Sequence, residues 1–297
     1  MIGIETVRKF LENDVEVFAL VRPNSKNANR LPNSPKLRVI ECDLKDTENL
    51  QINENGFDSF FHFGWRRVDR ENPNDWNKQI DNINDTLKCV ELADKTGCKT
   101  FIGAGTLVEY GRVYHKVKAN EYVVPNTVYA AAKYSAGILS RVLCHAKKLR
   151  HIWARIFGVY GIFDDEKTVI SYALSNMLNN LECNFTLCEQ VWDYIYSVDC
   201  ADAFYKIGLY GKNNAIYNIG TGRGKKLKDH IEKIKEITKS DSKLNFGAIP
   251  YEDIQPMYYV ADIKQLTRDT GWIPKTKFED GIQKILQFRE ANNSEKQ

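Results

Sequence analysis

The first part of the chain alternates between two hydrophobic periods. Apolar residues at helical spacing predict helices over residues 2–13, 74–96 and 129–148. Short, mostly apolar runs predict buried parallel strands over residues 16–21, 37–42, 57–63, 99–104 and 151–157. Strands that alternate with helices are typical of βαβ units, whose right-handed crossovers place helices on both faces of a sheet. The pattern therefore predicts an α/β fold with a doubly wound parallel sheet.

This rhythm loosens after residue 158. Short segments, the stretch Gly220-Thr221-Gly222 and residues 247–256 interrupt the alternation, which indicates a smaller second lobe with long loops. We expect residues 1–165 to form the sheet domain. Residues 166–297 should form mainly the second lobe, with some segments returning to the sheet.

Composition and charge exclude several classes of protein. The net charge of +3 argues against a dedicated nucleic-acid binder. No apolar run reaches the ~18 residues of a membrane span. The seven cysteines are scattered and form no C-x-x-C pair, so we expect neither a disulfide framework nor a metal site. Reduced thiols of this kind favour the cytoplasm.

Tyr129 and Lys133 are the first candidates for chemistry. Side chains four residues apart share one helix face. A fixed ammonium favours the phenolate and is expected to lower the pKa of the Tyr129 phenol, which would suit it to proton transfer near neutral pH. Such a pair also arises by chance on many helices, so other motifs must support it.

Further motifs are spaced along the whole chain. They are Asp43-Leu44 after a strand, His62-Phe63-Gly64, Asn82-Ile83-Asn84-Asp85-Thr86, Gly105-Thr106 followed by Tyr110-Gly111, Asp193-Tyr194-Ile195-Tyr196-Ser197-Val198-Asp199, Tyr217-Asn218-Ile219-Gly220 and Gly271-Trp272-Ile273-Pro274. With the Tyr129/Lys133 pair, they make the chain resemble the extended short-chain dehydrogenase/reductase family, in its nucleotide-sugar epimerase, dehydratase and reductase branch. The resemblance implies an NAD(P)-binding Rossmann-like domain over residues 1–165, a lobe for a nucleotide-sugar substrate, and a homodimer.

The resemblance also implies a catalytic set of Thr106, Tyr129 and Lys133. Tyr129 would exchange a proton with a sugar hydroxyl or carbonyl. Lys133 would lower the pKa of the phenol and hydrogen-bond the nicotinamide ribose. Thr106, at a strand end, would donate a hydrogen bond to the reacting oxygen. The nicotinamide would carry the hydride.

Cofactor contacts follow from the same resemblance. Asp43 and Leu44 would meet the adenine, and Phe63 and Gly64 would line the dinucleotide groove. The remaining contacts would come from Ile2, Gly3, Asn82, Tyr129 and Lys133. Arg22 follows the predicted strand 16–21, which corresponds to the second strand of the family plan. NAD enzymes carry a carboxylate at the end of that strand, whereas a guanidinium suits the 2′-phosphate of NADP. We therefore favour NADP over NAD.

The residues after Thr106 argue against dehydration. Family dehydratases place acidic groups there, but this chain has Leu107 and Val108, and Glu109 is expected to point the wrong way. Reduction of a keto-sugar is favoured slightly over 4-epimerisation. The alternatives are a non-catalytic Rossmann-like nucleotide-binding protein, and a subunit with a role in assembly through helices 74–96 and 129–148.

The start of the chain departs from the family plan. A Rossmann-like sheet opens with a strand and a glycine-rich turn, but here a helix comes first and Gly3 stands where the last glycine of that turn would fall. We expect the first strand and turn to be missing, and a longer form to begin roughly ten residues earlier. Two inner strands should then show unpaired edges. Weak cofactor binding and poor solubility would follow.

Overall fold

The structure, a computed structural model, describes residues 1–66, 75–252 and 255–294. The predicted elements of the first part are all present. They are α1 (Ile2–Glu12), β1 (Val17–Val21), β2 (Leu37–Glu41), β3 (Ser59–His62), α2 (Trp76–Lys95), β4 (Thr100–Thr106), α3 (Val128–Ala146) and β5 (Arg150–Ile156). Three short 3-10 helices join them, over Lys26–Arg30, Leu44–Asn49 and Leu107–Tyr110.

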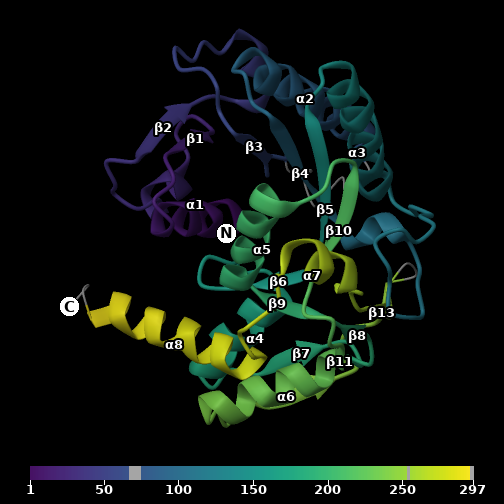
Figure 1. The fold of residues 1–297 in the computed structure, drawn as a ribbon. Helices are drawn as coiled ribbons and strands as arrows, with labels where there is room; N and C mark the ends of the chain where they lie inside the picture. Colours follow the sequence, from purple (N-terminus) through teal and green to yellow (C-terminus); the bar gives the residue numbers. More distant parts are fainter. Residues whose placement is uncertain (67–74, 253–254, 295–297) are drawn as a thin grey trace.

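The main sheet has four parallel strands in the order β10-β5-β4-β3, where β10 (Ala215–Ile219) returns from the later part of the chain. Successive side chains on β4 point to opposite faces. Phe101 packs with the cluster under α2 and α3, whereas Ile102 packs with Phe204 of α5 (Ser197–Tyr210) on the other face. Helices thus cover both faces, and the predicted doubly wound Rossmann-like fold is confirmed (Figure 1).

A second, smaller lobe lies beyond the sheet domain, at the foot of Figure 1. Its core unites Tyr160, Leu174, Phe185 and Ile231 with neighbouring apolar residues. Its elements are β6 (Gly158–Tyr160), α4 (Val169–Leu178), β7 (Cys183–Phe185), β8 (Val191–Trp192), β9 (Tyr194–Tyr196), β11 (Lys225–Lys226), α6 (Leu227–Thr238), β12 (Leu244–Phe246), β13 (Tyr258–Tyr259) and α8 (Phe278–Ser294). The helix α7 (Lys264–Thr270) instead packs on α5 and β10 of the sheet domain. None of the helices in the described part of the chain is long and apolar enough to cross a membrane.

The parallel sheet is divided into two parts. β1 pairs with β2 in a separate two-stranded sheet, and among the described residues no strand lies between β1 and β3. Both β1 and β3 therefore present an unpaired inner edge, as the sequence predicted for a chain without its central strand. Figure 1 shows β1 and β2 set apart from β3 and β4.

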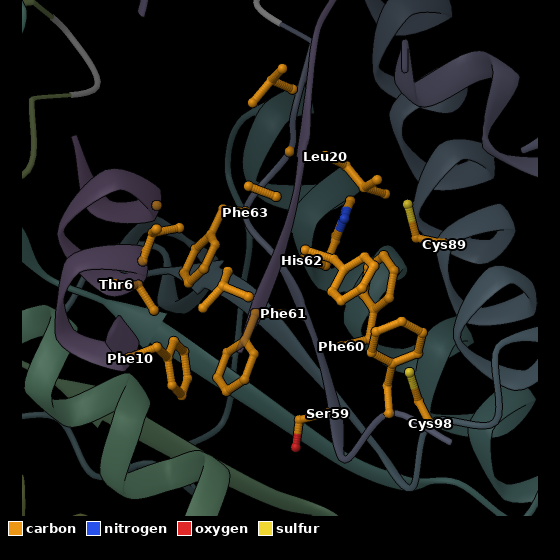
Figure 2. A pocket seen from close by; sticks show the side chains of 18 of the residues that line it. Thr6, Phe10, Leu20, Ser59, Phe60, Phe61, His62, Phe63, Cys89 and Cys98 are labelled. Atoms are coloured by element: carbon orange, nitrogen blue, oxygen red, sulfur yellow. The ribbon is translucent and has the colours of Figure 1, made fainter. Parts of the chain in front are cut away.

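A cavity of about 1410 Å³ occupies this division. Its middle, between β1 and β3, is the part that we call the strand slot. Figure 2 shows Phe61 and Phe63 on the side of Thr6 and Phe10, and Phe60 and His62 on the side of Cys89 and Cys98. Its upper end, at the carboxyl ends of β1 and β3, is the part that we call the rim.

Candidate active site

The first turns of α3 carry the Tyr129/Lys133 pair. The helix begins there because the hydroxyl of Thr127 accepts a hydrogen bond from the backbone N–H of Ala130 at 3.1 Å, an N-cap. Lys133 is buried, and its ammonium donates to the carbonyl of Ala104 on β4 at 2.9 Å. The Lys133 side chain is therefore held against the carboxyl-terminal part of β4.

Trp65 contacts both Lys133 and Tyr129. The ammonium of Lys133 lies 3.9 Å from the centroid of the Trp65 ring, a cation–π contact. The Tyr129 ring meets the same indole edge-on, with 6.1 Å between centroids. The sequence reasoning missed Trp65. Its place directly after Phe63-Gly64 at a strand end was the only signal available.

The net shift of the Tyr129 pKa is upward, not downward as expected. Burial raises the pKa of the Tyr129 phenol to about 12, and the hydrogen bond from Thr106 offsets only part of that rise. Burial also lowers the pKa of the Lys133 ammonium to about 8. Burial in a dry site disfavours both charged forms, so the phenol stays protonated at neutral pH and the ammonium is close to losing its proton.

Thr106 ends β4 and begins the short 3-10 helix that follows. Its hydroxyl oxygen accepts from the backbone N–H of Glu109, while its own N–H donates to the Glu109 carboxylate at 2.8 Å, forming a capping box. Because a hydroxyl oxygen that accepts in this way still has its proton to give, Thr106 can donate toward the phenol or a substrate oxygen.

Glu109 is held in a buried ionic network beneath Thr106. Its carboxylate accepts from the Arg155 guanidinium at 2.8 Å and from the Trp153 indole at 3.1 Å. The carboxylate is thus engaged by Arg155, by Trp153 and by the backbone of Thr106. The network itself was not predicted, although the Thr106-x-x-Glu109 spacing is a recognisable capping-box signal.

Trp153 fits beneath the site because three neighbours lack side chains. A Cβ on Gly103 or Gly105 would lie 2.2 or 2.3 Å from the Trp153 ring, and one on Gly137 would lie 2.8 Å from it. Any larger residue there would displace the indole. We call these three glycines and Trp153 the indole socket.

The rim of the large cavity gathers most of the predicted cofactor residues. Its lining includes Gly3, Arg22, Asp43, Leu44, Phe63 and Gly64, and continues to Trp65. Through Trp65 it adjoins Lys133 and Tyr129. The groove lies at strand carboxyl ends and has largely apolar walls, with the guanidinium groups of Arg22 and Arg66 in its lining and the buried ammonium of Lys133 beyond Trp65. These features fit a nicotinamide dinucleotide.

Two predicted contacts lie elsewhere. The Asn82 side chain is buried and bonds the Arg66 backbone, accepting from its N–H and donating to its carbonyl at 3.0 Å, so it fixes the segment after Gly64. Ile2 packs against the core cluster beside α5. Neither lines the cavity. No group of three or more metal-ligating side chains is found in the described residues.

Comparison with known proteins places this geometry in a family. The model of the family described as "NAD dependent epimerase/dehydratase family" matches residues 1–220 of this chain. The CDP-abequose synthase of Salmonella muenchen is 36% identical over 138 residues, which span 46% of this chain and 47% of that protein. The dTDP-D-glucose 4,6-dehydratase of Bos taurus is 26% identical over 279 residues, spanning 90% of this chain and 78% of that protein.

The chain spans less than half the length of the first curated relatives that it matches. Among solved structures, UDP-glucose 4-epimerase from Thermotoga maritima, with UDP-glucose, superposes with a TM-score of 0.87 at 25% identity, covering 98% of this chain and 96% of that one. With the parallel sheet and the family match over residues 1–220, these findings show that the chain belongs to the NAD-dependent epimerase/dehydratase family.

Proposed function

We propose that the chain is an NAD(P)-dependent nucleotide-sugar oxidoreductase that reduces a keto-sugar linked to a nucleoside diphosphate. Residues 1–165 hold the cofactor, and residues 166–297 hold mainly the substrate, with β10 returning to the sheet. The similar proteins are named for reactions of CDP-abequose, dTDP-D-glucose and UDP-glucose, which supports this substrate class.

The observation that carries the proposal is the convergence of Thr106, Tyr129 and Lys133. The Thr106 hydroxyl forms a hydrogen bond with the Tyr129 phenol. Lys133, whose ammonium is buried, follows Tyr129 one helical turn later on α3. A bound nicotinamide would supply hydride chemistry beside this group. Tyr129 gives its proton to the carbonyl oxygen that becomes an alcohol, and Thr106 orients that oxygen.

We favour reduction slightly over 4-epimerisation. Reduction of a carbonyl needs Tyr129 in its protonated form, and burial, which raises the pKa to about 12, disfavours the phenolate at neutral pH. A 4-epimerisation begins by taking a proton from an alcohol, which suits a phenolate. Dehydration is also disfavoured, because Leu107 and Val108 carry no acid and the Glu109 carboxylate is engaged by Arg155.

NADP is the proposed cofactor, with NAD as the alternative. Arg22 is exposed at the end of β1 and lines the rim, where a guanidinium would bind a 2′-phosphate. Lys133 would hold the nicotinamide ribose, and Gly64 would let the dinucleotide pass close to the backbone.

The divided sheet favours a second candidate, a nucleotide-binding protein without turnover. Incubation with NADPH and a panel of nucleotide-4-keto-sugars, following absorbance at 340 nm, separates the two. Oxidation of NADPH that Tyr129→Phe abolishes, while cofactor binding persists, supports the reductase. Equal turnover by the wild type and Tyr129→Phe would reject the catalytic assignment.

We also propose a homodimer formed through α2 and α3, which pack side by side (Figure 1). Their outer faces leave large apolar side chains exposed, namely Trp76, Ile80, Leu139 and Val142.

A further inference from the structure

We propose that Gln79 of α2 is a positioning residue that acts through Trp65: its amide oxygen fixes the indole so that the ring face stays over the ammonium of Lys133. The inference rests on the function proposed above for Tyr129 and Lys133. It adds to that site a residue from a second helix, which acts on the ammonium only by holding its aromatic neighbour in place.

The buried face of α2 is polar in its first half and apolar in its second. Gln79, Asn82, Asp85 and Thr86 are each at most 2% exposed, whereas the buried residues that follow, from Cys89 onward, are apolar. A helix that packs on a sheet normally turns apolar side chains toward the core. A buried set of polar residues at helical spacing departs from that rule, and such departures are expected where a protein builds a functional site.

Three of these four polar side chains fasten the segment that leaves β3. Asn82 bonds the backbone N–H and carbonyl of Arg66. The Asp85 carboxylate accepts from the Arg66 guanidinium at 2.7 Å, and the Thr86 hydroxyl lies 3.1 Å from Nε2 of His62. These contacts fix the path of the chain at the end of the strand, which accounts for three of the four.

Gln79 differs because its partner is a side chain that touches the candidate catalytic pair. Its Oε1 accepts from Nε1 of Trp65 at 3.1 Å. The centroid of the same ring lies 3.9 Å from Nζ of Lys133, and the ring meets Tyr129 edge-on. Because the indole N–H lies at one edge of the ring, turning the ring about its side-chain bonds would break the hydrogen bond. Gln79 therefore selects the orientation in which the ring face meets the ammonium.

The titratable groups around Lys133 make this ring face important for its charge. Glu109 favours the ammonium, but its own charge is balanced by Arg155. His62 of β3 stays neutral, since burial lowers its pKa to about 3, and Tyr129 stays protonated, since burial raises its pKa to about 12. Burial lowers the pKa of the Lys133 ammonium to about 8, so a cation–π contact helps to keep it charged.

Gln79→Met tests the proposal, with Gln79→Glu as the matched control. Met has a similar size but no strong acceptor, so the indole N–H loses its partner, whereas Glu keeps an oxygen at the same place. A purely structural residue would tolerate Met and suffer from a buried carboxylate. The positioning role predicts the opposite order for Lys133. If Gln79→Met does not fold, Gln79→Asn, whose amide is one methylene too short to reach the indole, takes its place.

The first readout needs no turnover. In protein labelled with isotopic tryptophan, the indole N–H resonance of Trp65 is assigned by its loss in Trp65→Leu, and it should titrate with Lys133 near pH 8. Gln79→Met should lower that midpoint by about 0.3–1.5 pH units, the upper figure corresponding to loss of the whole cation–π contact. Gln79→Glu should keep the midpoint or raise it. An unchanged midpoint in Gln79→Met, or an equal fall in Gln79→Glu, would overturn the proposal.

The second readout asks whether Gln79 acts through the indole. In the Trp65→Leu background, Gln79→Met should cause no further change in the pH at which kcat/KM falls. An additive change would show that Gln79 acts independently of Trp65, and would also overturn the proposal. If the wild type oxidises no NADPH with any keto-sugar, the proposed function fails, but the titration of the Trp65 resonance still decides the role of Gln79.

Discussion

The guanidinium of Arg155 donates to the carboxylate of Glu109 at 2.8 Å, and neither side chain is more than 2% exposed. Because Glu109 also accepts from the backbone of Thr106, this ion pair anchors the turn that carries the candidate hydroxyl. The pair is costly to break, since a buried charge left without its partner has no water to stabilise it.

Glu109→Gln should therefore lower the free energy of unfolding by about 3–5 kcal/mol. The amide keeps an oxygen for the Thr106 N–H but leaves the Arg155 charge unbalanced. Urea denaturation measures the loss. The double variant Glu109→Gln/Arg155→Met removes both charges, and it should be more stable than Glu109→Gln alone. If it is no more stable, the ion pair is not the cause.

The value of kcat/KM should fall as the pH rises through about 8. The pKa of Lys133 is lowered to about 8 by burial, so its charged form predominates below that pH and is lost above it. The pKa of Tyr129 is raised to about 12, which keeps the phenol outside this range. Lys133→Arg keeps the charge at all accessible pH values, and any residual activity should lack the falling limb. A limb that persists in this variant would assign it to another group.

Trp65→Leu should move the falling limb of the kcat/KM profile, which is assigned to Lys133, to lower pH. The indole stabilises the charged ammonium by a cation–π contact worth about 0.5–2 kcal/mol, so its loss corresponds to roughly 0.4–1.5 pH units. Trp65→Phe keeps an aromatic face and should shift the limb less. Identical profiles for Leu and Phe at this position would show that the ring face does not act on Lys133.

Arg22→Asp should reverse the cofactor preference. Loss of a charge-assisted hydrogen bond to phosphate, worth about 1.5–3 kcal/mol, should weaken NADPH about 10-fold to 150-fold, while NADH changes little or improves. Fluorescence titration with both cofactors measures the ratio. Arg22→Lys is the matched control and should keep the preference for NADPH in weakened form.

Leu139→Glu/Val142→Glu should convert the proposed dimer to a monomer. Both side chains are exposed on α3, at 44% and 60%, so the charges cost little in the monomer but would be buried unpaired in the interface. Light scattering after size exclusion gives the mass. Leu178→Glu, at an equally exposed leucine of α4, should leave the mass unchanged.

Local pattern was sufficient to predict the elements up to residue 157, because periodicity and turn residues act over short distances. It was not sufficient for the second lobe, where strands such as β8, β11 and β13 span only two residues and have no period to detect. The rim residues were predicted because they follow strand ends, and strand ends of a parallel sheet meet at one edge.

The electrostatics of the site depended on long-range packing. The spacing of Tyr129 and Lys133 correctly placed them on one helix, but the sign of the Tyr129 shift depends on burial, which the spacing does not reveal. The contacts of Glu109 with Arg155 and Trp153, more than 40 residues away, likewise have no local signature.

The indole socket has an evolutionary consequence. Gly103, Gly105, Gly137 and Trp153 fill one volume, so the four positions should vary together among descendants of this chain. A smaller residue at 153 would open a void that an alanine at 103 or 137 could fill, whereas an alanine beside an unchanged tryptophan would be rejected. In evolution, the substitution of Trp153 by a smaller residue must therefore come before a glycine of the socket is replaced by alanine.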